Sequence, residues 1–394
     1  MRGLRIGSAF GIPVRLNWTF LIVLPLFAVF IAWDIAELVV VINQTFGATL
    51  DPAQLTEGNL PWVLGLASAL GLFTGVLLHE FGHSLVALRY GYEIDSITLW
   101  LLGGVASFTE FPEDWRHELV IAIAGPVVSV LLGVGSYVAF TSLPPSVDAA
   151  RFVFGYLAIL NIVLAAFNLL PGFPMDGGRI LRALLARNQP HAKATQQAAA
   201  VGKVFAFGLG LLGLFANWFL IILAFFIYIA ASGEAQQTTI KAAFEDITVS
   251  DLMTPEENLE TVSEETTISD LLARMFTERH IGYPVVRNGD LVGMVTLDDA
   301  GAVEEVERDA YRVEDVMSTE LHTITPDADA MTAFQQMQQN GVGRLPVVDE
   351  AGDLVGIVSR TDMMRAFNVI QSGGPPRTLG QPTSEPVSRE HRPS

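Results

Sequence analysis

The sequence predicts a bundle of six membrane-spanning helices followed by a soluble α/β module. The 394 residues are 51% hydrophobic and the mean hydropathy is +0.41, which is too apolar for an ordinary soluble protein. The apolar residues gather in long runs before about residue 240. After this point the apolar density falls and two similar sequence units follow. We therefore expect a membrane domain over 1–240, a soluble domain over 241–370 and a disordered tail over 371–394.

Six apolar runs are predicted to cross the bilayer, since about 20 apolar residues span its hydrocarbon core. Six crossings place both termini on one side. The basic residues indicate that this side is the cytosol, because Lys and Arg concentrate in cytosolic loops. The chain is thus expected to be a multi-pass protein of the cell membrane. The runs cover residues 16–42, 60–90, 119–143, 152–170, 198–215 and 218–231.

Residues 91–108 differ from the spans that flank them. Ile94, Ile97 and Trp100 favour a strand, and Gly103-Gly104 interrupts the segment, which is too short to span as a helix. A strand or re-entrant hairpin lying against the helices is one interpretation, because irregular backbone at membrane depth must lie against protein or a water-filled cavity. An ordinary interfacial loop is the other.

The charge is concentrated in the second half of the chain. Residues 241–370 hold 26 Asp and Glu against nine Lys and Arg, a balance of −17 out of −19 for the whole chain. This acidity excludes nucleic acid as a partner. Three lysines against twenty arginines, on an acidic background, resemble the composition of proteins from halophilic archaea. With no cysteine, the chain has neither a disulfide framework nor a thiolate metal site.

The second apolar run contains His79-Glu80-Phe81-Gly82-His83, an H-E-x-x-H pattern. Residues i and i+4 share one face of a helix. His79 and His83 could therefore hold one Zn²⁺, with Glu80 placed to activate a water molecule. The pattern also occurs by chance in soluble helices. Its apolar context favours function, because an ionisable residue at membrane depth is costly.

A catalytic zinc usually has three protein ligands, and Asp176 is the candidate for the third. It lies in the segment NLLPGFPMDGG, residues 168–178. The second and the fourth span both run towards the cytosol in this topology. Asp176, which follows the fourth span, is therefore expected at the same depth as the two histidines of the second span. Judged from the segment alone, Asp176 is better explained as a cap of the following helix or as a partner of Arg179.

HEFGH and NLLPGFPMDGG, supported by Gly103-Gly104 and Ala124-Gly125-Pro126, resemble the site-2 protease family of intramembrane zinc metalloproteases. The resemblance covers roughly residues 10–235. It implies that His79, His83 and Asp176 bind one zinc ion and that Glu80 is the general base. It also implies that Asn168 positions the substrate or steadies the oxyanion. The expected substrates are transmembrane segments of other membrane proteins.

The soluble half contains an internal repeat of about 63 residues, with units near 247–303 and 311–370. Each reads as strand, helix, strand-turn-strand, helix. The pair resembles tandem cystathionine-β-synthase (CBS) domains, which implies an adenine nucleotide as ligand and allows a homodimer. The residues that match the nucleotide pattern are Gly293, Thr296, Asp299, Gly356, Ser359 and Asp362. Alternatively, the two aspartates only cap or solvate their helices.

The sequence therefore predicts an intramembrane zinc protease that CBS domains gate from the cytosol. A CBS-regulated transporter is the first alternative. It would usually carry acidic residues in several spans, whereas residues 119–143 and 198–231 contain none. A catalytically inactive scaffold is the second, and the intact His79, Glu80, His83 and Asp176 argue against it.

Overall fold

The computed structural model describes residues 3–100, 103–108, 112 and 114–372. The chain divides into two compact units, Met1–Thr238 and Thr239–Ser394. The predicted disordered tail, apart from residues 371 and 372, lies outside the described residues.

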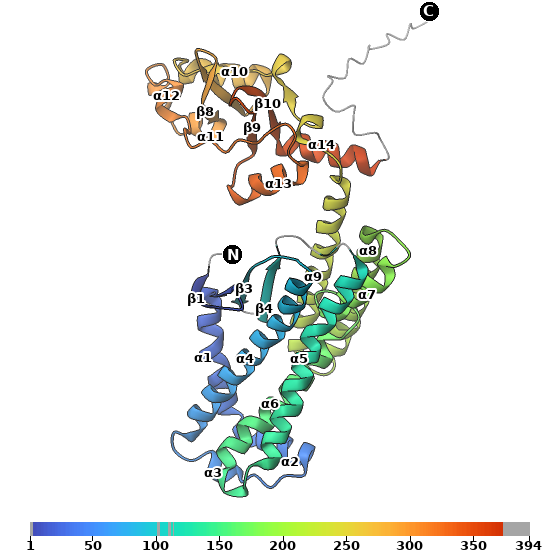
Figure 1. The fold of residues 1–394 in the computed structure, drawn as a ribbon. Coiled ribbons are helices and arrows are strands. Elements are labelled where there is room, and N and C mark those ends of the chain that lie inside the picture. Colours follow the sequence, from blue (N-terminus) through green and yellow to red (C-terminus); the bar gives the residue numbers. More distant parts are fainter. Residues whose placement is uncertain (1–2, 101–102, 109–111, 113, 373–394) are drawn as a thin grey trace, which may run out of the picture. The chain divides into compact units, whose positions relative to one another are not determined.

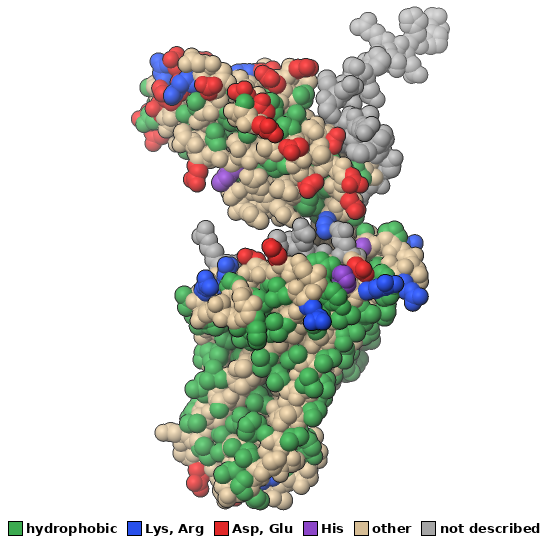
Figure 2. All heavy atoms as spheres, viewed as in Figure 1, with side chains coloured by type: hydrophobic (Ala, Val, Ile, Leu, Met, Phe, Trp, Pro, Cys, Tyr) green, Lys and Arg blue, Asp and Glu red, His purple; other side chains and the backbone are tan. Residues whose placement is uncertain are grey.

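Unit 1 is a bundle of long helices with a small sheet at one end (Figure 1). Its apolar side chains face outwards along the flank of the bundle, and charged groups gather towards the ends (Figure 2). This distribution suits a helix bundle surrounded by lipid. The helices are α1 (Trp18–Trp33), α2 (Ile35–Phe46), α3 (Pro52–Leu55), α4 (Leu60–Arg89), α5 (Trp115–Ser142), α6 (Asp148–Asn168), α7 (Asp176–Ala186), α8 (His191–Gly213) and α9 (Trp218–Ala243).

The prediction of six spans is not matched by the helices themselves. Among the described residues, four helices are long and apolar enough to cross a bilayer, namely α4, α5, α6 with the short turn before it, and α9. The predicted first span is instead α1 and α2, bent by 73° at Asp34, and this pair would make a fifth. Helix α8 is not among the helices that are long and apolar enough, because it begins with the polar stretch from His191 to Gln197.

A four-stranded sheet in the order β1-β2-β3-β4 lies at the end of the bundle opposite α2 and α3 (Figure 1). Its strands are β1 (Leu4–Ala9), β2 (Ile12–Leu16), β3 (Ile94–Trp100) and β4 (Gly103–Phe108). The β-prone segment 91–108 thus forms an antiparallel hairpin rather than an interfacial loop. The first hairpin was not predicted; its strand β2 pairs in parallel with β3.

The sheet packs on the helix that carries H-E-x-x-H. Ile12, Val14 and Ile97 form one buried cluster with Phe81 of α4. Leu99 joins a second cluster with Phe73 of the same helix. These contacts fix the hairpin β3–β4 beside α4.

Unit 2 contains two similar α/β repeats with separate apolar cores. The first includes β6 (Val262–Ser263), α10 (Ile268–Glu278), β7 (Gly282–Arg287), β8 (Asp290–Thr296) and α11 (Leu297–Gly301). The second includes α12 (Val313–Val316), α13 (Ala330–Gln339), β9 (Arg344–Val348), β10 (Leu354–Ser359) and α14 (Arg360–Gln371). Strand β5 (Thr254–Pro255) belongs to the first repeat by its place in the sequence but pairs with β10 of the second, so the repeats are interlocked. Acidic side chains are frequent on the face of unit 2 seen in Figure 2.

Candidate metal centre

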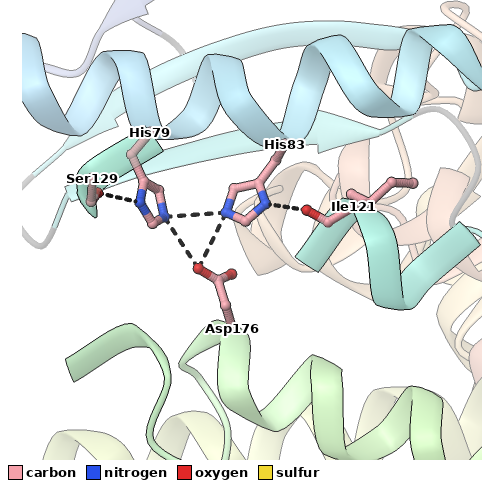
Figure 3. A network of polar contacts seen from close by, with 5 residues as sticks. All are labelled: His79, His83, Ile121, Ser129 and Asp176. Carbon is pink, nitrogen blue, oxygen red and sulfur yellow. Dashed lines mark hydrogen bonds and ion pairs between the residues drawn. The ribbon is translucent and has the colours of Figure 1, made fainter. Parts of the chain in front are cut away.

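Helix α4 places the two histidines of H-E-x-x-H side by side. His79 and His83 are 4% and 3% exposed, one helical turn apart near the C-terminal end of α4. Their rings meet edge to face, with centroids 4.8 Å apart. Both rings point away from α4 towards the N-terminal end of α7 (Figure 3).

Asp176 is the first residue of α7 and meets the two histidines from the opposite side (Figure 3). The N-cap position of α7 is Met175, and no side chain caps this helix. The interpretation of Asp176 as a helix cap is therefore wrong. Its carboxylate instead points across the bundle to α4, about a hundred residues earlier in the chain.

Three ligand atoms lie at almost equal distances from one another. His79 Nε2 and His83 Nε2 are 3.1 Å apart, and they lie 3.1 Å and 3.2 Å from Asp176 Oδ2. Two ligands of a tetrahedral zinc ion, each about 2.0–2.1 Å from the metal, are about 3.3 Å apart. The three side chains form the one group of His, Asp and Glu with metal-ligand spacing among the residues that the structure describes.

The hydrogen bonds of the rings explain why a cation fits between them. His83 Nδ1 donates to the carbonyl oxygen of Ile121 at 2.7 Å, because a carbonyl can only accept. In the neutral ring, His83 Nε2 is then a bare acceptor facing the carboxylate of Asp176 and the other imidazole. Acceptors that face each other in a buried space repel, and a Zn²⁺ ion between them removes the repulsion. The residues present therefore fit the metal.

Helix α5 supplies support that the sequence analysis missed. Ser129 Oγ lies 2.9 Å from His79 Nδ1, and the carbonyl of Ile121, on the same helix, holds His83. A hydrogen-bond partner on the second ring nitrogen fixes tautomer and orientation of a metal-binding histidine. Gly125 lies between these two residues, and a Cβ there would overlap His83 Nε2 and lie 2.7 Å from His79 Nε2. The Gly125-Pro126 pair was noticed in the sequence but without this role.

Glu80, the remaining polar residue of the motif, lies next to the sheet. It is half-buried, and a Cβ at Gly104 of strand β4 would overlap Glu80 Cγ. Glycine at 104 therefore lets the strand cross directly over this side chain. Asn168, the other predicted catalytic residue, is the last residue of α6 and is half-buried.

Unit 2 contains a cavity of about 440 Å³ between the two repeats, within the usual size of small-molecule sites. Thr296 and Asp299 of the predicted nucleotide pattern line it. Gly293, Gly356, Ser359 and Asp362 are not part of this lining. The lining also includes Arg344 and His322, neither of which belongs to the predicted nucleotide pattern.

Both predicted pairs of hydroxyl and carboxylate form helix caps. Asp299 Oδ2 accepts from the amide of Thr296 at 2.8 Å and from its Oγ at 2.6 Å. Ser359 and Asp362 form the same capping box at the start of α14. The alternative interpretation of the two aspartates as helix caps is thus what the structure shows. Asp299 still lines the cavity while it caps α11.

Comparison with known proteins gives two matching families. The model of peptidase family M50 matches residues 67–152 and 145–211, and the CBS domain model matches 249–300 and 313–369. A zinc metalloprotease of Methanocaldococcus jannaschii is 34% identical over 369 residues, which are 93% of this chain and 97% of that protein.

Two solved structures are also similar. The site-2 protease of Methanocaldococcus jannaschii is 33% identical with a TM-score of 0.42, covering 59% of this chain and 95% of that one. The structure of CBSX2 in complex with AMP is 30% identical with a TM-score of 0.29, covering 32% and 98%.

A zinc-type ligand set inside an apolar helix bundle defines the class of membrane metalloproteases. The chain belongs to the site-2 protease family of zinc metalloproteases, peptidase family M50, and carries a tandem pair of CBS domains.

Proposed function

We propose that the chain hydrolyses peptide bonds within or near transmembrane segments of other membrane proteins, with one Zn²⁺ held by His79, His83 and Asp176. The observation that carries the proposal is the triangle of ligand atoms, 3.1–3.2 Å on each side. It is buried between α7 and the helices α4 and α5, and the latter two are long and apolar enough to span a bilayer. A structural ion pair would not need two histidines whose other nitrogens are both engaged.

The chemistry falls to a few residues. When bound, the zinc ion supplies a Lewis acid. Glu80 takes a proton from the attacking water and passes it to the leaving amine. Asn168 is proposed to donate a hydrogen bond to the developing oxyanion, a type of contact worth about 3–4 kcal/mol.

The sheet offers a way to present the substrate to Glu80. In the order β1-β2-β3-β4, strand β4 is an edge, and an edge strand exposes unpaired backbone groups. A substrate that unwinds into an extended strand could add to β4. At Gly104 it would then pass beside the Glu80 carboxylate.

The proposal includes the orientation of unit 1 in the cell membrane. The four strands and α7 lie at one end of the bundle, which we place at the cytosolic side together with both termini. Arg5, Arg15, Arg89 and Arg116 belong to this end by their places in the chain, in agreement with the excess of basic residues in cytosolic loops.

We further propose that the cavity of unit 2 binds an adenine nucleotide that gates the protease. Arg344 lines the cavity, and its guanidinium forms no hydrogen bond or ion pair within the described part of the chain. Burial holds the pKa of its guanidinium below the usual value, although the nearby Asp362 and Tyr283 act in the opposite direction. A cation that is partly desolvated and unpaired favours a phosphate. Asp298, Asp299 and Glu320 in the same lining can accept from ribose hydroxyls or an amino group.

The deciding experiment is Glu80→Gln, with Glu37→Gln on the exposed face of α2 as the matched control. The wild type and both variants should bind about one zinc per chain. Only Glu80→Gln should lose cleavage of a reporter transmembrane peptide, by at least about 100-fold, the lower range for a general base. Equal cleavage by Glu80→Gln and wild type would refute the protease mechanism. Ion flux without cleavage in reconstituted vesicles would favour a transporter.

A further inference from the structure

A buried ion network joins three helices next to the metal centre. Arg182 of α7 is 5% exposed, as is Glu118 of α5. Arg182 Nε donates to Glu118 Oε1 at 2.6 Å, and Arg182 Nη2 forms an ion pair with the same oxygen at 2.5 Å. Arg182 Nη1 donates to Glu234 of α9 at 2.8 Å. The guanidinium is thus shared between two carboxylates on different helices, which a planar fork with five donors allows.

The same guanidinium covers the loop that leads to Asp176. Its Cζ lies 5.0 Å from the centre of the Phe173 ring. Phe173 is 2% exposed and packs in one apolar cluster with Ala198 and Ala199 of α8 and Ala231 of α9. The loop therefore shares an apolar cluster with α9 through Phe173, while Arg182 joins α7 to α9 by its bond to Glu234.

Close backbone contacts make this arrangement rigid. A Cβ at Gly172 would lie 2.5 Å from the Cα of Gly202 on α8, and a Cβ at Gly178 would lie 2.5 Å from the Phe173 amide nitrogen. Loop, α7 and α8 are thus packed backbone against backbone. Movement of α9 relative to α7 has to strain either the Phe173 packing or the shared Arg182 ion pair.

Helix α9 continues without a break into unit 2. It ends at Ala243, and Phe244, which follows, is 4% exposed in the apolar core of the second repeat, with Ile240 packed against the same core. One helix therefore takes part in the support of Asp176 at one end and in the core of unit 2 at the other.

We propose that Arg182 and Glu234 are positioning residues for the third metal ligand, and that the state of unit 2 reaches the metal centre through α9 and this ion pair. The inference deepens the proposed function and rests on Asp176 binding zinc. It places the regulatory input on the Asp176 side of the site rather than on the two histidines, whose supports come from α5.

The test compares Glu234→Gln and Arg182→Lys with the control Glu245→Gln, an exposed residue just after α9. Lysine retains the charge next to Glu118 but cannot bridge both carboxylates. Both network variants should bind zinc about tenfold more weakly in a chelator competition, as for other groups that orient a metal ligand. In the zinc-free protein, the amides of residues 169–178 should exchange with solvent about tenfold faster. The control should match the wild type in both measurements.

Two further results test whether Arg182 and Glu234 act as one unit and whether the path from unit 2 runs through α9. If Arg182 and Glu234 act as one unit, the double variant should be no weaker than either single variant; additive losses would overturn the shared role. Phe244→Ala should also speed exchange of 169–178, and unchanged exchange there, with faster exchange in unit 2, would overturn the path through α9. Because exchange is measured without zinc or substrate, a failure of the protease proposal leaves this test intact.

Discussion

Replacing Gly125 with alanine is expected to weaken zinc binding at the metal centre while α5 stays folded. A Cβ at this position would overlap His83 Nε2 and would lie 2.6 Å from His83 Cε1 and 2.7 Å from His79 Nε2. Real Cβ atoms essentially never approach other heavy atoms this closely. At least one imidazole must therefore turn away from the metal.

The expected loss follows from the cost of an extra methyl group in a packed site, about 1–3 kcal/mol. At about 1.4 kcal/mol per factor of ten, zinc affinity should fall by roughly 5- to 150-fold. The strain falls on metal binding because, without zinc, the rings are free to rotate. The zinc-free variant should accordingly melt close to the zinc-free wild type.

The measurement is a competition between the protein in detergent and a zinc chelator of known affinity. Gly135→Ala is the matched control, since Gly135 lies on the same helix and a Cβ there meets nothing within 4 Å. Alanine in a helix is favoured over glycine by about 1 kcal/mol, so the control should keep its zinc and melt slightly higher. Wild-type zinc affinity in Gly125→Ala would refute the assigned geometry.

Three further predictions concern other parts of the chain. Ser129→Ala should weaken zinc binding about tenfold, because the His79 imidazole loses the hydrogen-bond partner that orients it. Ser142→Ala, on the same helix but bonded only to a backbone carbonyl, should keep the wild-type affinity. Equal zinc affinities of the two variants would contradict this role of Ser129. Gly104→Ala should lower the cleavage rate of a reporter peptide with zinc content unchanged, because the new methyl displaces the carboxylate of H-E-x-x-H; normal cleavage would contradict the edge-strand geometry. The Tyr283 hydroxyl, and then an arginine, hold the pKa of Glu278 below its usual value. This stabilisation is present above the pKa of Glu278 in the unfolded state and is lost as the pH falls through its pKa in the folded state. In Tyr283→Phe, the free energy of unfolding of unit 2, measured with urea, should therefore decrease less on acidification than in the wild type.

The local part of the metal centre could be predicted from spacing alone. Helical periodicity puts His79 and His83 on one face, and their Nε2 atoms are 3.1 Å apart in the structure. Asp176 shows where such reasoning fails. Judged from its own segment it is a better helix cap than a ligand, and only the packing of α7 opposite α4 shows the opposite. That packing is not encoded in any short stretch of sequence.

The sheet and the first span show the same limit. Residues 4–16 could not be predicted as strands from their own sequence, because the partner that makes β2 a strand, Ile97 on β3, lies more than 80 residues later. Residues 16–42 were predicted to form a single span, and the structure instead bends at Asp34 between α1 and α2. Hydropathy measures how apolar a run is, but it does not report a change of direction within that run.

The CBS pair shows which contacts a repeat can and cannot predict. The internal repeat predicts the paired strands and helices of each unit, since these contacts are local. It did not give the exchange of β5 into the sheet of the second repeat, nor the participation of His322 in the cavity lining. Both features depend on how one repeat packs on the other.

The metal centre depends on small residues as much as on its polar ones. Gly125 leaves room for the imidazoles and Gly104 lets β4 cross Glu80, while a Cβ at Gly177 would overlap the carbonyl of Leu170. Each of these glycines has a φ outside the left-handed region, so their need is close approach rather than a special backbone conformation. If larger side chains filled these positions, α4, α5 and α7 could not approach closely enough to place the ligand atoms 3.1–3.2 Å apart. The ligands therefore define the chemistry of the centre, and the glycines around them set its dimensions.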